Sequence, residues 1–158
     1  MAPGLMYLID TNVISAGARA KTQAGAGPVA WMDLVTWMDE ASDALFLSVV
    51  TVAEIEDGIA KARREGATRK AAELAGWLEA LVHLYGSRIL AIDLAVSRTA
   101  GKLSDAARGR GHASGFADIL IAATALHHEL VILTRNVRHF EPLGVPVLNP
   151  FDKLPHSR

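Results

Sequence analysis

The stretch Leu-Met-Tyr-Leu-Ile-Asp-Thr-Asn at residues 5–12 decides how the whole chain is interpreted. Its first five residues form a short, continuous apolar run, which is typical of a buried strand covered on both faces. Asp10 follows this strand directly, and sites in parallel α/β sheets form at the carboxyl ends of the strands. An aspartate at this position also suits the N-cap of a following helix. Position alone therefore leaves both a functional and a structural role open for Asp10.

Strand-like and helix-like segments alternate along the rest of the chain. Apolar runs predict strands at residues 5–9, 45–50, 89–92, 130–134 and 145–148. Helical periodicity predicts helices at residues 29–40, 51–65, 70–85, 93–108 and 116–128, with a Gly/Ala-rich loop at 17–28. Asp93 is expected to be the N-cap of the fourth helix. The alternation predicts an α/β fold with a mainly parallel sheet of four to five strands. We expect one domain over 1–158, with a core at about 5–150 and a short tail at 151–158.

The composition is that of an ordinary globular protein. Of 158 residues, 51% are hydrophobic and 21% are charged, which excludes wholesale disorder. The chain has no cysteine, which excludes a disulfide framework, a thiolate zinc site and a cysteine nucleophile. It has neither a signal peptide pattern nor an apolar run long enough to span a membrane, so we expect a cytoplasmic protein. Residues 1–79 carry a net charge of −4 and residues 80–158 one of +3, which permits contact with nucleic acid without requiring it.

Two acidic residues stand out besides Asp10. Asp118 is the only charged residue in the apolar segment 115–126, which predicts a buried helix. Burying an unpaired carboxylate costs several kcal/mol, so it must be neutralised, paired or bound to a cation, although the dipole of the helix start could also stabilise it. Glu54 lies early in the helix after the second strand. It is weaker evidence, because with Asp57 and Lys61 it could belong to a solvated face.

These side chains are predicted to meet at one edge of the sheet. Asp10, Glu54 and Asp118 would face one pocket together with Thr134 and Asn136, which follow the fourth strand. Carboxylates that share a site repel one another, and a divalent cation relieves that repulsion. Ligands that are all oxygen atoms favour Mg²⁺ or Mn²⁺ over zinc.

Other catalytic motifs are missing or incomplete. The chain has no Walker A pattern, no His-Glu-x-x-His zinc pattern and no Gly-x-Ser-x-Gly elbow. Residues 25–30 match a dinucleotide fingerprint by letter, but no strand precedes them and Pro28 removes a backbone N–H group where phosphate would bind. A phosphatase that forms an aspartyl phosphate on Asp10 would need an acid two residues later, where this chain has Asn12.

Four segments resemble the PIN-domain ribonucleases, and among them the VapC toxins of bacterial toxin–antitoxin modules, including FitB-like members. They read Tyr-Leu-Ile-Asp-Thr-Asn-Val-Ile-Ser at 7–15, Thr-Val-Ala-Glu-Ile-Glu-Asp-Gly-Ile at 51–59, Ala-Asp-Ile-Leu-Ile-Ala-Ala-Thr-Ala at 117–125 and Thr-Arg-Asn-Val-Arg-His-Phe at 134–140. The resemblance implies a three-layer α/β/α fold and a Mg²⁺-dependent endoribonuclease toxin that hydrolyses RNA. It also implies a homodimer that a VapB-like antitoxin holds inactive.

By position, the resemblance assigns the acidic metal-site residues to Asp10, Glu54 and Asp118. Many PIN domains have a fourth acid near the end of the fourth strand, where this chain has Thr134, Asn136 and His139.

Supporting roles are expected for a few further polar and basic residues. Thr11, Thr134 and Asn136 would support the acidic residues. The candidates for contact with RNA phosphates are Arg108, Arg110, Arg135, Arg138 and His112, although each could also be ordinary surface charge.

Two other functions remain open. The missing fourth acid is compatible with a degenerate PIN domain that acts as a binding module. The second alternative is a small phosphoryl-accepting domain built on Asp10.

Overall fold

The fold is built on a five-stranded parallel sheet. The computed structural model describes residues 4–18 and 28–155. The strands are β1 (Tyr7–Ile9), β2 (Leu45–Ser48), β3 (Ile89–Leu90), β4 (Val131–Leu133) and β5 (Val147–Leu148), in the order β3-β2-β1-β4-β5. All four pairings are parallel. The first strand in the sequence therefore lies at the centre of the sheet.

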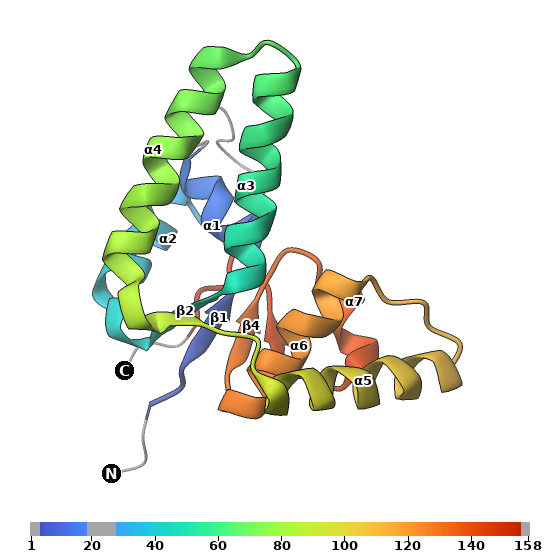
Figure 1. The fold of residues 1–158 in the computed structure, drawn as a ribbon. Coiled ribbons are helices and arrows are strands. Elements are labelled where there is room, and N and C mark those ends of the chain that lie inside the picture. Colours follow the sequence, from blue (N-terminus) through green and yellow to red (C-terminus); the bar gives the residue numbers. More distant parts are fainter. Residues whose placement is uncertain (1–3, 19–27, 156–158) are drawn as a thin grey trace.

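Helices cover both faces of the sheet (Figure 1). One face is covered by α1 (Thr11–Ala18), α2 (Trp31–Glu40), α3 (Val49–Arg64) and α4 (Thr68–Tyr85). The other is covered by α5 (Leu94–Gly109), α6 (Phe116–His128) and α7 (Val137–Phe140). Short 3₁₀ turns lie at Ser42–Ala44, Gly86–Arg88 and Glu141–Leu143. This arrangement confirms the predicted three-layer α/β/α fold.

The side chains of β1 divide between two hydrophobic cores. Tyr7 and Ile9 pack with the residues of α1 to α4, whereas Leu8 packs with those of α5 to α7. Successive side chains of a strand point to opposite faces, so a strand between two helical layers must be apolar throughout. All three residues are buried.

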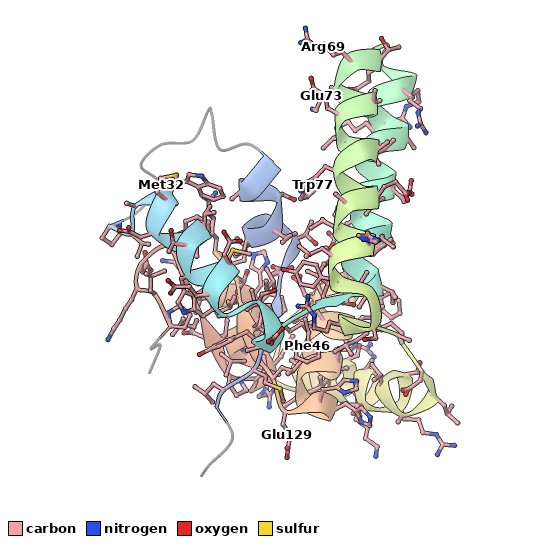
Figure 2. All side chains as sticks on the ribbon, turned by 90° about the vertical axis from the view of Figure 1, so that its left-hand side faces the viewer. Met32, Phe46, Arg69, Glu73, Trp77 and Glu129 are labelled. Atoms are coloured by element: carbon pink, nitrogen blue, oxygen red, sulfur yellow. The ribbon has the colours of Figure 1, made fainter. Side chains whose placement is uncertain are left out.

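The helices α3 and α4 form a long hairpin that extends beyond the sheet (Figure 1). Its far end carries charged side chains, among them the exposed ion pair of Arg69 and Glu73, whose Nε and Oε1 atoms lie 3.4 Å apart (Figure 2). An exposed pair of this kind contributes little to stability. Within the described residues, no helix has the length and apolar character that crossing a membrane requires.

Some strands and helices begin or end at other residues than the sequence predicts. The predicted strand at 45–50 ends at Ser48, because the Oγ atom of Ser48 accepts a hydrogen bond of 3.0 Å from the N–H of Val50 and caps α3. The expected loop at 17–28 is wrong for residues 17 and 18, which end α1, and its residues 19–27 lie outside the described part of the chain. The N-cap role of Asp93 is confirmed by a 2.9 Å hydrogen bond from the N–H of Val96. The helix at 116–128 is less buried than predicted, since Phe116 is 73% exposed.

Candidate functional site

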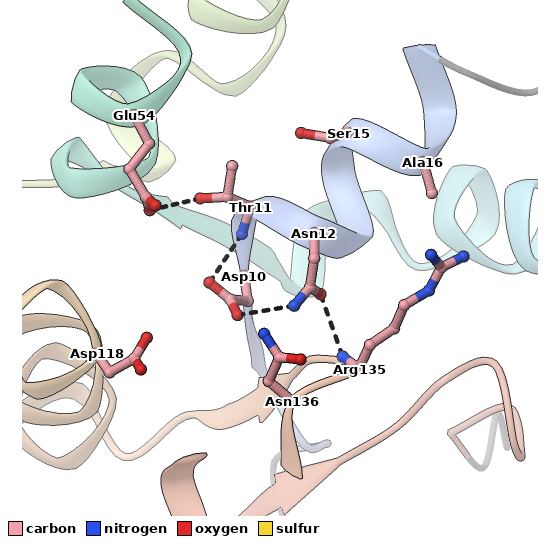
Figure 3. Close-up of a pocket in the computed structure, with 9 residues that line it drawn as sticks. All are labelled: Asp10, Thr11, Asn12, Ser15, Ala16, Glu54, Asp118, Arg135 and Asn136. Atoms are coloured by element: carbon pink, nitrogen blue, oxygen red, sulfur yellow. Dashed lines mark hydrogen bonds between the residues drawn. The ribbon is translucent and has the colours of Figure 1, made fainter. Parts of the chain in front are cut away.

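A pocket of about 360 Å³ opens beside the carboxyl end of β1 (Figure 3). Its walls come from α1, α3, the start of α6 and the segment that follows β4. The lining residues are Asp10, Thr11, Asn12, Ser15, Ala16, Glu54, Asp118, Arg135 and Asn136. We call it the acidic pocket, because the three carboxylates predicted to meet all line it.

Asp10 lies at the start of α1 and also lines the acidic pocket. Its backbone carbonyl accepts the first hydrogen bonds of α1, from the N–H groups of Val13 and Ile14 at 3.0 and 3.2 Å. Its side chain is turned into the acidic pocket instead of capping those groups. The Oδ1 atom accepts a hydrogen bond from the N–H of Thr11 at 2.9 Å, and Oδ2 accepts one from the Oγ1 atom of Thr134 at 2.8 Å.

The environment of Asp10 opposes its negative charge. The residue is only 6% exposed, and this burial is the main reason why the pKa of its carboxyl group is raised. The hydrogen bonds from Thr134 and Thr11 lower the pKa in part, and the charges of Asp118 and Glu54 raise it further. The net effect is a carboxylate that a nearby cation would stabilise.

Hydrogen bonds from Thr134 and Asn12 hold the carboxylate of Asp10 in place. Thr134 is fully buried, and its Oγ1 atom accepts hydrogen bonds from the backbone N–H of Asn136 at 2.9 Å and the Nδ2 atom of Asn12 at 3.2 Å. Nδ2 of Asn12 also lies 3.3 Å from Oδ2 of Asp10, and its Oδ1 accepts a hydrogen bond from the N–H of Arg135 at 3.1 Å. The sequence analysis assigned no role to Asn12, although it lies only two residues after Asp10.

Glu54 lies in the second turn of α3 and is exposed. Its Oε1 atom accepts a hydrogen bond of 2.8 Å from Oγ1 of Thr11, which shares a second hydrogen bond, of 3.1 Å, with Oγ1 of Thr51. The carboxylate of Glu54 therefore points toward the acidic pocket, as Figure 3 shows. This contact favours a role in the site over membership of a purely solvated face.

Asp118 lies in the first turn of α6, at the rim of the acidic pocket. Its side chain is 27% exposed, so the expectation that this carboxylate is buried is wrong. It has a partner in His139, whose Nδ1 atom lies 3.3 Å from Oδ2 of Asp118. The residue in the region of the expected fourth acid therefore contacts one of the three carboxylates.

The arginines considered for RNA contact lie in different places. Arg135 lines the acidic pocket, and its guanidinium carbon lies 3.8 Å from the centroid of the Phe151 ring. Such a cation–π contact holds the side chain in place. Arg108 and Arg110 do not line the acidic pocket. Arg110 donates a hydrogen bond to the backbone oxygen of Pro142, and Arg108 is exposed.

The acidic pocket can accept a divalent cation of the magnesium type. Its candidate ligands are all oxygen atoms, which suits Mg²⁺ or Mn²⁺. Among the residues that the structure describes, no three acidic or histidine side chains are close enough to hold an ion together. Mg²⁺ does not require such a cage, because it usually keeps several waters and binds through one or two carboxylates. The raised pKa of Asp10 gives an independent reason for a cation here.

Comparisons with known proteins agree with this geometry. The PIN domain family matches residues 7–143. A VapC ribonuclease, Y4jK of Sinorhizobium fredii, is 35% identical over 147 residues, which cover 93% of this chain and 99% of the relative. Toxin FitB of Neisseria gonorrhoeae is 32% identical over 149 residues, or 92% of this chain and 99% of FitB.

A solved structure of a related protein has the same fold as this chain. The structure of FitAcB from Neisseria gonorrhoeae has a chain that is 33% identical to this one, with a TM-score of 0.76. The alignment covers 92% of this chain and 98% of the FitAcB chain. The family match, the two relatives and the shared fold together show that the chain belongs to the PIN-domain family, in its group of VapC-type toxins of toxin–antitoxin systems.

Proposed function

We propose that this protein is a Mg²⁺-dependent endoribonuclease that hydrolyses phosphodiester bonds of RNA, with Mn²⁺ as an alternative ion. The observation that carries the proposal is the convergence of Asp10, Glu54 and Asp118 on one pocket from three distant parts of the chain. Burial is the main reason why the pKa of Asp10 is raised, and the charges of Asp118 and Glu54 raise it further, a repulsion that a bound cation would relieve. Similarity to a VapC ribonuclease supports a nuclease activity.

Each side chain has a role that follows from its contacts. Asp10 and Asp118 would hold the ion, and Glu54 would orient the attacking water or a second ion. Thr134 keeps Oδ2 of Asp10 in place, and Thr11 does the same for the carboxylate of Glu54.

Asn136 and Arg135 complete the acidic pocket, where Asn136 can contribute an amide oxygen through a water and Arg135 can bind a phosphate oxygen. When bound, the ion supplies positive charge that activates water and offsets the charge developing on the phosphate.

The proposal includes the partners expected for a VapC-type toxin. We infer that a VapB-like antitoxin binds this protein and holds it inactive in the bacterial cytoplasm, and that the toxin itself forms a homodimer. Support comes from the names of the relatives, which are a VapC ribonuclease and the toxin FitB.

Calorimetry with Mn²⁺ tests the metal site without any assumption about the RNA. Wild-type protein, purified free of antitoxin, should bind Mn²⁺, and Asp118→Asn should lose that binding. Asp105→Asn is the matched control, because Asp105 is an exposed acid on α5 that does not line the acidic pocket, and it should bind as the wild type does. Absence of binding by the wild type would favour the degenerate binding module.

Growth of bacteria tests the catalytic step. Expression of the wild type without an antitoxin should arrest growth, and expression of Asp10→Ala to the same level should not. RNA from the arrested cells should contain new cleavage products. Equal toxicity of the two proteins would refute hydrolysis through Asp10.

A further inference from the structure

A second pocket lies next to the acidic pocket, and Asp118 belongs to the walls of both. It has a volume of about 350 Å³. Its remaining walls include His112 and Ser114 on one side and Arg138, His139 and Pro142 on the other. We call it the basic pocket, because Arg138, His112 and His139 line it and, among the described residues, Asp118 is its one acid.

The basic pocket lies between two segments of the chain that a hydrogen bond joins. The turn between α5 and α6 provides one wall, and α7 with the 3₁₀ turn after it provides the other. Arg110 joins them, since its guanidinium group donates a hydrogen bond to the backbone oxygen of Pro142. The turn reverses at Gly111, whose φ of +80° suits glycine, and is closed by a 2.8 Å hydrogen bond from the N–H of His112 to the oxygen of Ala107. The pocket is therefore a built feature of the fold.

The lining of the basic pocket suits an anion. Arg138 carries a permanent positive charge, and within the described residues no carboxylate lies within ion-pair distance of it. Ser114 and His112 add side chains that can donate hydrogen bonds to oxygen atoms. A guanidinium group beside such donors is a typical environment for a phosphate group. The volume is also within the range of pockets that bind small ligand groups.

The position of the basic pocket explains why an anion would bind there. The three carboxylates of the acidic pocket repel a polyanion such as RNA, so the substrate needs attraction from groups outside that pocket. The two pockets adjoin, because Asp118 lines both of them. A strand whose scissile phosphate lies in the acidic pocket can therefore place a neighbouring phosphate in the basic pocket.

Resting on the proposed function, we propose that the basic pocket binds a phosphate group adjacent to the scissile one in single-stranded RNA, with Arg138 as its charged contact. Contacts to phosphate groups fix the position of a strand without reading its sequence. The basic pocket thus sets where the strand lies, and His139 holds the side chain of Asp118 at the boundary between the two pockets.

Binding of fluorescein-labelled oligouridylate, followed by anisotropy in EDTA, tests this proposal without any cleavage. The Kd is measured at several salt concentrations for the wild type, Arg138→Ala, Arg138→Lys and Arg63→Ala. Arg63 is the matched control, because it is an exposed arginine on α3 that does not line either pocket. Arg138 is also exposed, so its replacement should leave the thermal unfolding of the protein unchanged.

Arg138→Ala should raise the Kd about tenfold at low salt and reduce the slope of log K against log salt by about 0.7, the value for one contact with a single-stranded phosphate. Arg138→Lys should keep the slope, and Arg63→Ala should match the wild type. An unchanged Kd and slope for Arg138→Ala would overturn the proposal. Loss of binding by Arg63→Ala alone, or no measurable binding by the wild type at low salt, would overturn it as well.

An assay of RNA cleavage by the wild type with Mn²⁺ tests the proposed function separately from the phosphate subsite. Cleavage together with an unaltered Arg138→Ala Kd refutes the phosphate subsite and leaves the nuclease intact. Weakened binding by Arg138→Ala without cleavage by the wild type supports the subsite and refutes the nuclease.

Discussion

Replacing Thr134 by valine should destabilise the metal-free protein strongly, and more at neutral pH than in acid. Valine keeps the shape of the buried side chain and removes only the hydroxyl group. The Oγ1 atom of Thr134 donates a 2.8 Å hydrogen bond to Asp10 and accepts one of 2.9 Å from the N–H of Asn136. The variant therefore loses a hydrogen bond to a charged group and leaves a backbone donor without its acceptor.

The size of the effect follows from these contacts. A hydrogen bond to a charged group contributes roughly 1.5–3 kcal/mol, and an unsatisfied buried donor costs about 1–3 kcal/mol. A total loss of about 3 kcal/mol corresponds to a decrease in Tm of roughly 6–12 °C for a chain of this length.

The hydrogen bond from Thr134 lowers the pKa of Asp10, so its removal raises that pKa further. The difference in unfolding free energy between wild type and variant should therefore shrink as the pH falls through the pKa of Asp10, because a protonated Asp10 has no charge to stabilise.

Thermal and urea unfolding in EDTA, at neutral and mildly acidic pH, measure this difference. Thr124→Val is the matched control, since Thr124 is also fully buried but donates its hydrogen bond to the neutral backbone oxygen of Leu120. We expect Thr124→Val to cost about 1 kcal/mol at both pH values. The reasoning is refuted if Thr134→Val costs no more than Thr124→Val, or if its cost does not change with pH.

Three further predictions concern the charges of the acidic pocket. The pKa of Asp10 is raised above its ordinary value of about 3.9, so its contribution to stability is present at low pH and is lost as the pH rises through the raised pKa. Mn²⁺ should therefore raise the Tm at neutral pH and have little effect in acid, which thermal unfolding with and without the ion will measure. Asp118→Asn should raise the Tm of the metal-free protein slightly, because it removes a charge that opposes Asp10 and loses only a half-exposed pair with His139. A lower Tm would mean that this pair outweighs the repulsion. Asn12→Ala should weaken Mn²⁺ binding by about 10–100-fold in calorimetry, because Asn12 holds Asp10, the proposed ligand of the ion; unchanged affinity would contradict that role.

The layers of the fold could be predicted from the sequence because the sheet is buried on both faces. Tyr7, Leu8 and Ile9 are all apolar for that reason, and an uninterrupted apolar run indicates such a strand directly. The boundaries were harder to predict, because single polar contacts set them. Ser48 ends β2 only because its hydroxyl group caps α3. A helix after Asp10 was left open through the N-cap alternative, but the extent of α1 was not predicted, because its last residues overlap the expected Gly/Ala-rich loop.

The sequence could predict which acidic residues line the acidic pocket. It could not predict the polar residues that contact them. Position after a strand indicated Asp10, and the only charge in an apolar segment indicated Asp118. Position gave weaker evidence for Glu54, which the resemblance to PIN domains strengthened. No local pattern shows that Asn12 will meet Thr134 and Arg135, which are 122 and 123 residues away, because the pairing of β1 with β4 creates those contacts. The partial exposure of Asp118 has a similar origin, since it depends on where the start of α6 lies against the rim of the acidic pocket.

The central position of β1 has a consequence for the order of events during synthesis. Asp10 is synthesised well before Leu133 and Thr134, which hold its backbone and its carboxylate, and the hydrogen bond to Thr134 spans 124 residues. Pairings between such distant segments form late, because the chain must close a long loop before the contact is gained. The acidic pocket therefore cannot form on the ribosome until most of the chain has emerged, and a stalled chain that ends before residue 131 lacks the strand that holds Asp10 in place. A chain with this topology therefore completes its acidic pocket only after β4 has been synthesised.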